Sequence, residues 1–120
     1  MEKPIKTIIV DDVKPVRLEL KAMLKEYPVI DVIGDAGNAE QAFHLVSKYH
    51  PDLIILDIKL PGLSGFDILD RLKGDFKIIF ISTFEEYKEK AMTYQPVDFI
   101  LKPINKDKLR KAIARLRNLP

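Results

Sequence analysis

Short apolar runs rich in β-branched residues alternate along the chain with segments in which apolar residues recur at helical spacing. The apolar runs predict five β-strands, over Thr7 to Val10, Val29 to Ile33, Leu53 to Ile58, Lys77 to Ser82 and Val97 to Leu101. These runs do not alternate with polar residues, so both faces of the sheet should be covered by helices. The pattern favours an α/β fold with a parallel, doubly wound sheet and helices on both faces.

Five amphipathic segments predict the helices that connect and follow these strands. Their expected buried positions are Val16, Leu20, Met23, Leu24 and Tyr27, then Ala39, Ala42, Phe43 and Val46, then Phe66 and Leu69, then Phe84, Tyr87, Ala91 and Tyr94, and finally Leu109, Ala112, Ile113 and Leu116. Asn38 is expected to cap the second helix, with Gln41 three residues later in the pattern of a capping box. Pro28, Pro51 and Pro96 follow the first, second and fourth segments and should mark where those helices end.

Polar residues stand where the predicted strands end. Asp11 and Asp12 follow the first strand, Asp57 closes the third, and Ser82 and Lys102 close the fourth and fifth. Each alone is an ordinary loop or capping residue. Together they should meet at one edge, because ligands of such sheets bind beyond the carboxyl ends of the strands. Three crowded carboxylates repel one another unless a cation neutralises them, and oxygen ligands suit a hard divalent ion such as Mg²⁺.

Composition fits one domain over residues 1–120, with 47% hydrophobic residues available for a single packed core. The absence of cysteine excludes disulfides and thiolate metal sites. No apolar stretch approaches the roughly 18 residues of a membrane span, so a cytoplasmic protein without membrane contact is expected. The net charge of +2 is too small to indicate nucleic-acid binding, although seven Lys or Arg residues gather between Lys102 and Arg117.

Taken in order, these strand ends and their neighbours resemble the receiver domains of two-component response regulators over essentially the whole chain. The matching segments are Val10-Asp11-Asp12, Leu56-Asp57-Ile58-Lys59-Leu60-Pro61-Gly62, Ser82 and Val97-Asp98-Phe99-Ile100-Leu101-Lys102-Pro103. The resemblance implies a flavodoxin-like strand order of 2-1-3-4-5. The segments Gly62 to Phe66 and Phe84 to Tyr87 are most similar to receivers of the LytTR class of transcription regulators.

The resemblance implies that Asp57 accepts a phosphoryl group from the phosphohistidine of a sensor histidine kinase. Mg²⁺ would be held by Asp12, Asp57 and the backbone carbonyl of Lys59, with Asp11 acting through water, and would neutralise charge on the phosphoryl oxygens. The chain would then be a phosphoacceptor and not an enzyme with turnover. It would phosphorylate itself from phosphodonors with the help of Mg²⁺ and would slowly lose the group again.

The resemblance also implies a switch. Lys102 and Ser82 would contact the phosphoryl group, and Phe99 would change rotamer when Ser82 moves, although plain core packing is the alternative for Phe99. The output surface, and a phosphorylation-dependent homodimer, would use the fourth helix, the fifth strand and the fifth helix. The Lys102–Pro103 peptide bond is expected to be cis.

Three positions depart from the family pattern. Val13 stands where receivers commonly carry a glutamate, and the cation of Lys14 follows it, so Mg²⁺ binding should be weaker. Thr83 replaces a small alanine after Ser82 and should narrow the approach of a phosphodonor or of hydrolytic water.

Two other functional classes are open at this stage. An Mg²⁺-dependent phosphohydrolase that works through an aspartyl phosphate needs a second aspartate two residues after Asp57, but Lys59 stands there. A nucleic-acid module would use the basic fifth helix, yet Leu109, Ile113 and Leu116 require that helix to dock on the sheet. The chain therefore fits a stand-alone receiver, or a receiver that reaches DNA only through a separate effector domain and so regulates transcription.

Overall fold

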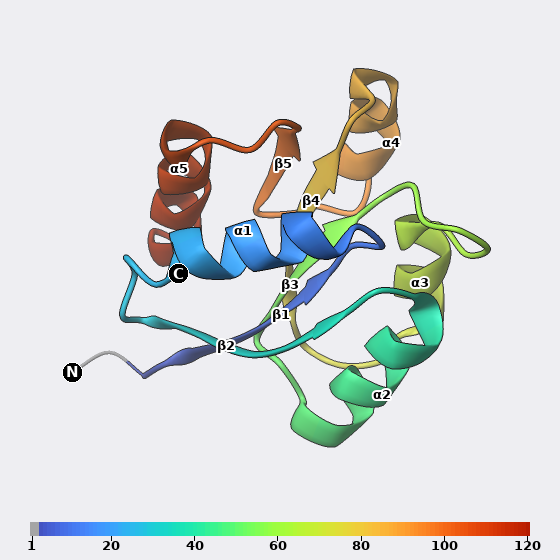
Figure 1. Ribbon diagram of the computed structural model, residues 1–120, viewed down its shortest axis with the longest axis horizontal. Coiled ribbons are helices and arrows are strands. Elements are labelled where there is room, and N and C mark those ends of the chain that lie inside the picture. Colours follow the sequence, from blue (N-terminus) through green and yellow to red (C-terminus); the bar gives the residue numbers. More distant parts are fainter. Residues whose placement is uncertain (1–2) are drawn as a thin grey trace.

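The computed structural model describes residues 3–120, which form one parallel sheet covered by helices (Figure 1). The strands are β1 (Ile5–Val10), β2 (Ile30–Ala36), β3 (Leu53–Asp57), β4 (Lys77–Ser82) and β5 (Asp98–Leu101). The helices are α1 (Lys14–Leu24), α2 (Ala39–Tyr49), α3 (Gly65–Arg71), the 3-10 turn η1 (Glu85–Tyr87), α4 (Lys88–Met92) and α5 (Lys106–Arg117). The strand order β2-β1-β3-β4-β5 confirms the predicted doubly wound, flavodoxin-like fold.

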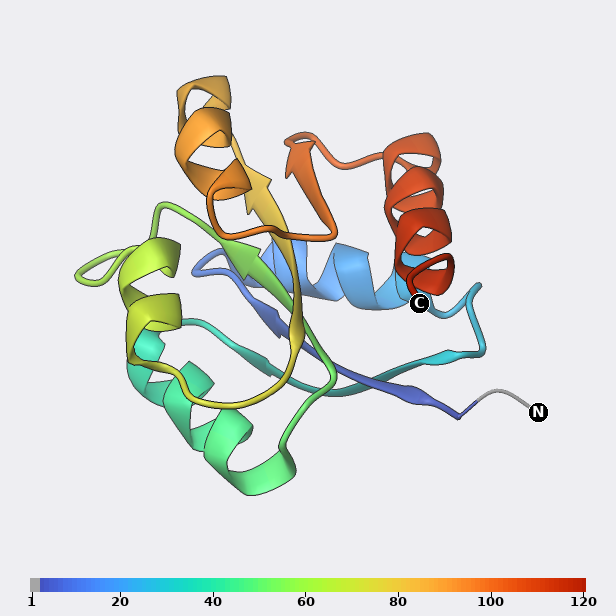
Figure 2. The same ribbon diagram turned by 180° about the vertical axis from the view of Figure 1, so that it is seen from behind.

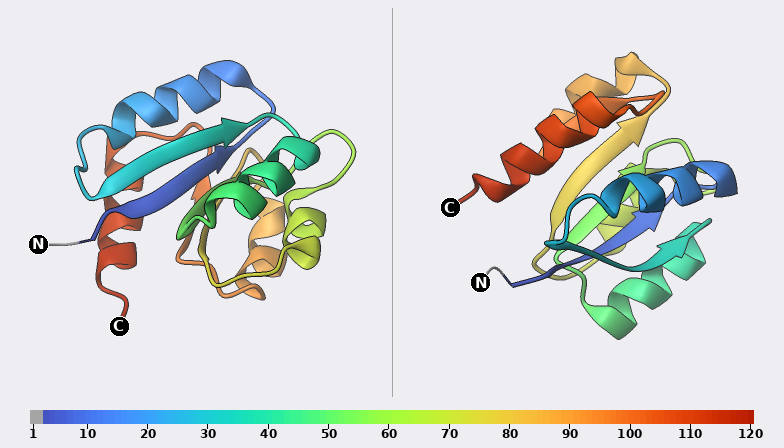
Figure 3. Two further views of the ribbon diagram at one scale, coloured as in Figure 1. Left: turned by 90° about the horizontal axis from the view of Figure 1, so that it is seen from below. Right: turned by 60° about the vertical axis from the view of Figure 1, so that its left-hand side comes forward.

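Helices α1 and α5 cover one face of the sheet, and α2, α3 and α4 cover the other (Figures 2 and 3). Alternate residues of each central strand point to opposite faces, so β1 sends Ile8 to one apolar cluster and Ile9 to the other. Phe80 at the centre of the first cluster and Ile79 in the second are both fully buried. A sheet buried on both faces fixes the register of its strands, and with it the position of every strand end.

Several predicted boundaries were wrong. Strand β1 begins at Ile5 and not at Thr7. Strand β2 continues to Ala36 instead of stopping near Ile33, because its ladder with β1 resumes after a register shift and runs through Gly34 and Asp35. Helix α1 ends at Leu24, and Tyr27 packs on the core from the loop that follows.

The fourth helical segment also differs from the prediction. Phe84 precedes η1 and is 37% exposed, and Tyr94 follows the end of α4, so neither lies on a continuous helix. Tyr94 nevertheless stacks on Phe66 at a centroid distance of 5.2 Å, and Tyr87 contacts the same ring edge-on. Aromatic contacts therefore join α3 to α4 although the helix is shorter than expected.

Helix α3 begins with a capping box that the sequence analysis missed. The Ser64 hydroxyl accepts from the Asp67 amide, and the Asp67 carboxylate accepts from the Ser64 amide. Gly65 is required here, because a Cβ at this position would lie 2.5 Å from the carbonyl oxygen of Asp57. The start of α3 is thereby packed against the end of β3.

The predicted cap of α2 is half right. Asn38 accepts from the Gln41 amide as expected, but the Gln41 side chain accepts from the amide of Gly37 instead of Asn38. The buried positions predicted for α5 are all confirmed.

Side chains satisfy backbone groups of the edge strand β5. The Lys108 ammonium donates to the carbonyl oxygens of Leu101 and Pro103 at 2.9 and 3.2 Å. At the other end, the Asp98 carboxylate accepts from the Phe99 amide at 2.8 Å and from Arg115 at 2.5 Å. Within residues 3–120, no helix is long and apolar enough to cross a membrane.

Candidate functional site

The carboxyl ends of β1 and β3 bring three acidic side chains together, as predicted. Asp11, Asp12 and Asp57 each offer a carboxylate oxygen, and these oxygens lie within 4.8 Å of one another. We call these three residues the acidic cluster. An all-oxygen donor set of this kind fits a hard divalent cation such as Mg²⁺ and does not suit a thiophilic metal.

Burial makes the acidic cluster electrostatically costly. Asp11 is fully buried and Asp57 is 4% exposed, whereas Asp12 is open to solvent. Burial first, and then the neighbouring carboxylate of Asp11, raise the pKa of Asp57 to about 6 from its ordinary value of 3.8, although Lys102 acts in the opposite direction. Additional positive charge at this site would therefore stabilise the ionised form of Asp57.

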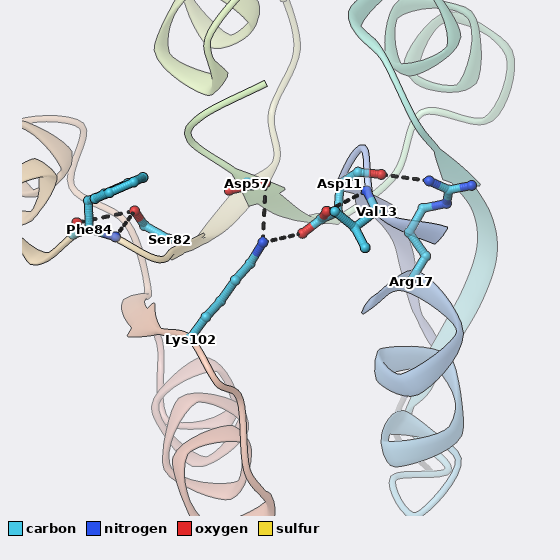
Figure 4. Close-up of polar contacts among 7 residues, drawn as sticks. All are labelled: Asp11, Val13, Arg17, Asp57, Ser82, Phe84 and Lys102. Carbon is cyan, nitrogen blue, oxygen red and sulfur yellow. Dashed lines mark hydrogen bonds and ion pairs between the residues drawn. The ribbon is translucent and has the colours of Figure 1, made fainter. Parts of the chain in front are cut away.

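Lys102 reaches the acidic cluster from the end of β5 (Figure 4). Its ammonium lies 2.7 Å from Asp11 Oδ2 and 3.3 Å from Asp57 Oδ2. Burial alone would lower the pKa of Lys102, but the hydrogen bond to Asp11 and the two carboxylate charges outweigh burial and raise it. The lysine is therefore held in its charged form against two of the three acids.

Hydrogen bonds fix both the backbone and the side chain of Asp11. Its amide donates to the Ala36 carbonyl, its Oδ1 accepts from the Val13 amide at 2.8 Å, and its carbonyl accepts from Arg17 Nη1 at 2.7 Å. With Oδ2 bonded to Lys102, both carboxylate oxygens of Asp11 have a partner. The Asp12 side chain, by contrast, makes no hydrogen bond or ion pair with any residue in the described part of the chain.

The sequence analysis missed Arg17. Its acceptors are a backbone carbonyl and Asp35, which lies at the end of a different strand. The one available signal was a basic residue in the first turn of α1, five residues after Asp12, and basic residues are common on solvated helix faces.

Ser82 is fully buried at the end of β4, but its hydroxyl faces its own loop (Figure 4). Ser82 Oγ accepts from the Phe84 amide at 3.0 Å and donates to the Phe84 carbonyl at 3.1 Å. The hydroxyl proton is thus committed to Phe84 in this conformation and not to the acidic cluster.

The other expected residues surround this core. The Lys59 ammonium lies 4.8 Å from the centre of the Phe84 ring, which links the loops that follow β3 and β4. Phe99 is half-buried and packs against the apolar cluster of α2, α3 and α4. The Lys102–Pro103 bond is cis, as predicted. Of the departures from the family pattern, Val13, Lys14 and Thr83 are all exposed, and Thr83 lines a hollow of about 300 Å³ beside Lys102.

The family model for the response regulator receiver domain matches residues 7–114. The chain belongs to this family. The receiver domain is 37% identical over 115 residues to the transcriptional regulatory protein BtsR of Escherichia coli K12, covering 94% of this chain and 48% of that protein. A response regulatory protein of Shewanella oneidensis matches equally, at 37% over 115 residues, with 94% of this chain and 49% of that protein covered. The receiver domain thus spans about half the length of the curated relatives it matches.

Solved structures agree with this assignment. A LuxR-family DNA-binding response regulator from Staphylococcus aureus superposes with a TM-score of 0.82 at 27% identity, covering 94% of this chain and 98% of that chain. The complex of CheX and CheY with BeF₃ and Mg²⁺ from Borrelia burgdorferi gives a TM-score of 0.85 at 20% identity, covering 98% of this chain and 92% of that one, and supports the fold alone. Family membership does not favour the phosphohydrolase alternative, and Lys59 stands where that chemistry needs an acid.

Proposed function

We propose that this receiver domain, over residues 1–120, accepts a phosphoryl group on Asp57 from the phosphohistidine of a sensor histidine kinase. The observation that carries the proposal is a nearly buried carboxylate at the end of β3, with two further carboxylates within 4.8 Å and a lysine ammonium at 3.3 Å. A carboxylate oxygen attacks phosphorus, the bond from phosphorus to the imidazole nitrogen breaks, and the histidine leaves as neutral imidazole once protonated.

The free oxygen of Asp57 fits the role of nucleophile. Lys102 binds Oδ2, whereas Oδ1 accepts no hydrogen bond from the residues that the structure describes. Lys102 therefore orients the carboxylate while one oxygen stays available for attack. The ammonium also lies close enough to stabilise negative charge as it develops on the phosphoryl group.

Mg²⁺ would be held by Asp12, Asp57 and the backbone carbonyl of Lys59, and it supplies the positive charge that neutralises the transferring phosphoryl oxygens. Both oxygens of Asp11 already have protein partners, which supports contact through water for this residue. The exposed Asp12 side chain has no competing partner in the described chain, which supports direct contact.

Ser82 connects the modified site to the rest of the domain in this proposal. To contact the phosphoryl group, its hydroxyl has to exchange the bond to the Phe84 carbonyl for one to phosphate. The loop between β4 and α4 moves with it, and Phe99 changes rotamer to fill the space. The surface formed by α4, β5 and α5 then favours a phosphorylation-dependent homodimer.

The output proposed is regulation of transcription, because the E. coli relative is a transcriptional regulatory protein and extends well beyond the matched region. DNA would be reached only through an effector domain attached to the receiver. A cytoplasmic location without membrane contact belongs to the same proposal, since bacterial transcription takes place there. The domain itself would act as a phosphoacceptor with slow autodephosphorylation and not as an enzyme.

Intact-mass measurement after treatment with acetyl phosphate and Mg²⁺ tests the proposal. The wild type should gain the mass of one phosphoryl group, and EDTA should prevent the gain. Asp57→Ala should show no gain, whereas the matched control Asp75→Ala, which removes an exposed carboxylate, should react like the wild type. Phosphorylation that persists in Asp57→Ala would place the acceptor elsewhere and refute the assignment.

A further inference from the structure

Arg17 joins the ends of two strands from its position on α1. Its Nε donates to Asp35 Oδ2 at the end of β2, and its Nη1 donates to the carbonyl oxygen of Asp11 just after β1, both at 2.7 Å. The side chain is only 15% exposed. In Figure 4, Arg17 and Lys102 approach Asp11 from opposite sides, so Arg17 contacts the backbone of the acidic cluster without entering the space between its carboxylates.

The carbonyl that Arg17 binds belongs to the peptide that links Asp11 to Asp12. Because a peptide unit is planar, a fixed oxygen sets the orientation of the whole plane and the direction in which the Asp12 Cα leaves it. The Asp12 side chain makes no hydrogen bond or ion pair of its own among the described residues. Its place beside Asp57 therefore depends on the backbone. Two side chains hold that backbone: the Asp11 carboxylate through the Val13 amide, and Arg17 through the Asp11 carbonyl.

The surroundings of Arg17 are built to receive it. Gly37 leaves room for the guanidinium, since a Cβ there would lie 3.1 Å from Nη1. Asp35 also pairs with Lys21 at 2.5 Å. Burial alone would raise the pKa of Asp35, but hydrogen bonds from Lys21 and Arg17 outweigh it and lower that pKa. Asp35 thus stays ionised and balances the charge of Arg17 next to a site that is to bind a cation.

We infer that Arg17, anchored by Asp35, is a positioning residue for divalent-cation binding, and that it acts by holding the Asp11–Asp12 peptide so that Asp12 faces Asp57. This inference rests on the proposed function, in which the acidic cluster binds Mg²⁺. Partners that orient metal ligands without touching the metal are typically worth about 10–100-fold in metal affinity.

The sign of the effect separates positioning from simple charge. Removing a cation near a metal site should tighten Mg²⁺ binding by Coulomb's law, whereas loss of a positioning contact should loosen it. Arg17→Gln removes both the charge and the two hydrogen bonds. We therefore expect its Mg²⁺ dissociation constant to rise about tenfold. The matched control is Lys21→Gln, which also removes one positive partner of Asp35 but leaves the hydrogen bond to the Asp11 carbonyl in place. Its affinity for Mg²⁺ should equal or exceed that of the wild type.

Isothermal titration of the intact domain with Mg²⁺, supported by the NMR shift of the Asp12 amide, measures these affinities. Arg17→Lys adds a variant that keeps the charge, and because one ammonium cannot reproduce the forked pair of bonds, it should also bind Mg²⁺ severalfold more weakly. The Arg17→Lys variant also tests the inference if Arg17→Gln does not fold. Failure of the wild type to bind Mg²⁺ would refute the proposed function. A wild type that binds, with Arg17 variants that bind equally well or more tightly, would overturn the positioning role alone.

Discussion

The ammonium group of Lys102 lies 2.7 Å from a carboxylate oxygen of Asp11, a residue with no solvent exposure. A buried carboxylate without a partner strongly destabilises the folded state. The contact with Lys102 therefore limits the cost of the acidic cluster to folding when no metal is bound. Lys102 and a divalent cation would therefore share the neutralisation of the same carboxylates.

Replacing Lys102 should expose this dependence. We expect Lys102→Met to lower the free energy of unfolding in EDTA by about 3 kcal/mol, because Asp11 would be left as an unpaired buried charge. Mg²⁺ binds only the folded site and should add about 2.7 kcal/mol to the wild type at a hundredfold excess over its dissociation constant. In the variant, Mg²⁺ should recover more stability, since it also replaces the missing cation.

Urea denaturation with EDTA or with Mg²⁺ measures both effects. Lys106→Met is the matched control, because the side chain of Lys106 is 79% exposed and its ammonium lies 3.5 Å from Glu26 at the surface. Its effect should be near zero. A Lys102→Met variant as stable as the wild type in EDTA would show that the contact with Asp11 contributes nothing.

Asp57→Asn should stabilise the metal-free domain at neutral pH. Burial and the nearby Asp11 raise the pKa of Asp57 to about 6, so the folded protein binds more protons than the unfolded chain between the ordinary value of 3.8 and that pKa. Stability from this group is fully present below pH 4 and is lost as the pH rises through 6. One pKa unit corresponds to about 1.4 kcal/mol, so the loss amounts to at most about 3 kcal/mol.

Denaturation in EDTA at pH values from 4 to 8 tests this prediction. The wild type should become less stable relative to Asp57→Asn as the pH rises, and Asp75→Asn, an exposed control, should follow the wild type. Parallel curves for the wild type and Asp57→Asn would count against the raised pKa. An Asn variant that is less stable than the wild type at pH 7 would count against repulsion within the acidic cluster.

Ser82→Ala should uncouple the site from the output surface. Fluoroberyllate mimics a phosphoryl group on the aspartate, and in the wild type we expect it to shift NMR resonances of α4, β5 and α5 and to increase the dimer population in sedimentation severalfold. A coupling of about 1–3 kcal/mol is typical of such switches. Without the hydroxyl, the loop at Phe84 loses the group that would be drawn to the phosphate.

Charges on the output surface should add little to the affinity of that dimer. Arg110 and Lys111 already pair with Asp107, and Asp98 already pairs with Arg115 within the same chain.

A Ser82→Ala variant that responds to fluoroberyllate as fully as the wild type would show that the hydroxyl is not the relay. Ser47→Ala, which removes an exposed hydroxyl on α2, is the matched control and should keep the response.

Much of this arrangement follows from local sequence. Apolar runs without alternation fixed the parallel sheet, and residues at strand ends had to meet once that sheet formed, which is why the acidic cluster and Lys102 were predicted together. The end of β2 was missed because Gly34 and Asp35 are polar or flexible residues on an edge strand, where pairing with β1 overrides propensity. The capping box at Ser64 was missed because the neighbouring Gly62 and Gly65 predict a turn and not the start of a helix.

Details of the site depend on contacts that no local pattern contains. Arg17 binds a backbone carbonyl and a carboxylate from another strand, and neither acceptor can be assigned before the fold is known. The orientation of the Ser82 hydroxyl depends on the conformation of its own loop. Sequence therefore identified the residues that meet, whereas the structure was needed for the bonds between them.

The side chains that hydrogen-bond to backbone groups of the edge strand β5 have a consequence for self-association. An uncovered edge strand is a template on which a second chain can extend the sheet, and such growth has no natural end. Here the Lys108 ammonium donates hydrogen bonds to the Leu101 and Pro103 carbonyls, and the Asp98 carboxylate accepts one from the Phe99 amide. A second copy that extends the sheet at this margin would first have to displace these side chains, which favours docking through helix side chains, and so closed pairs over fibres.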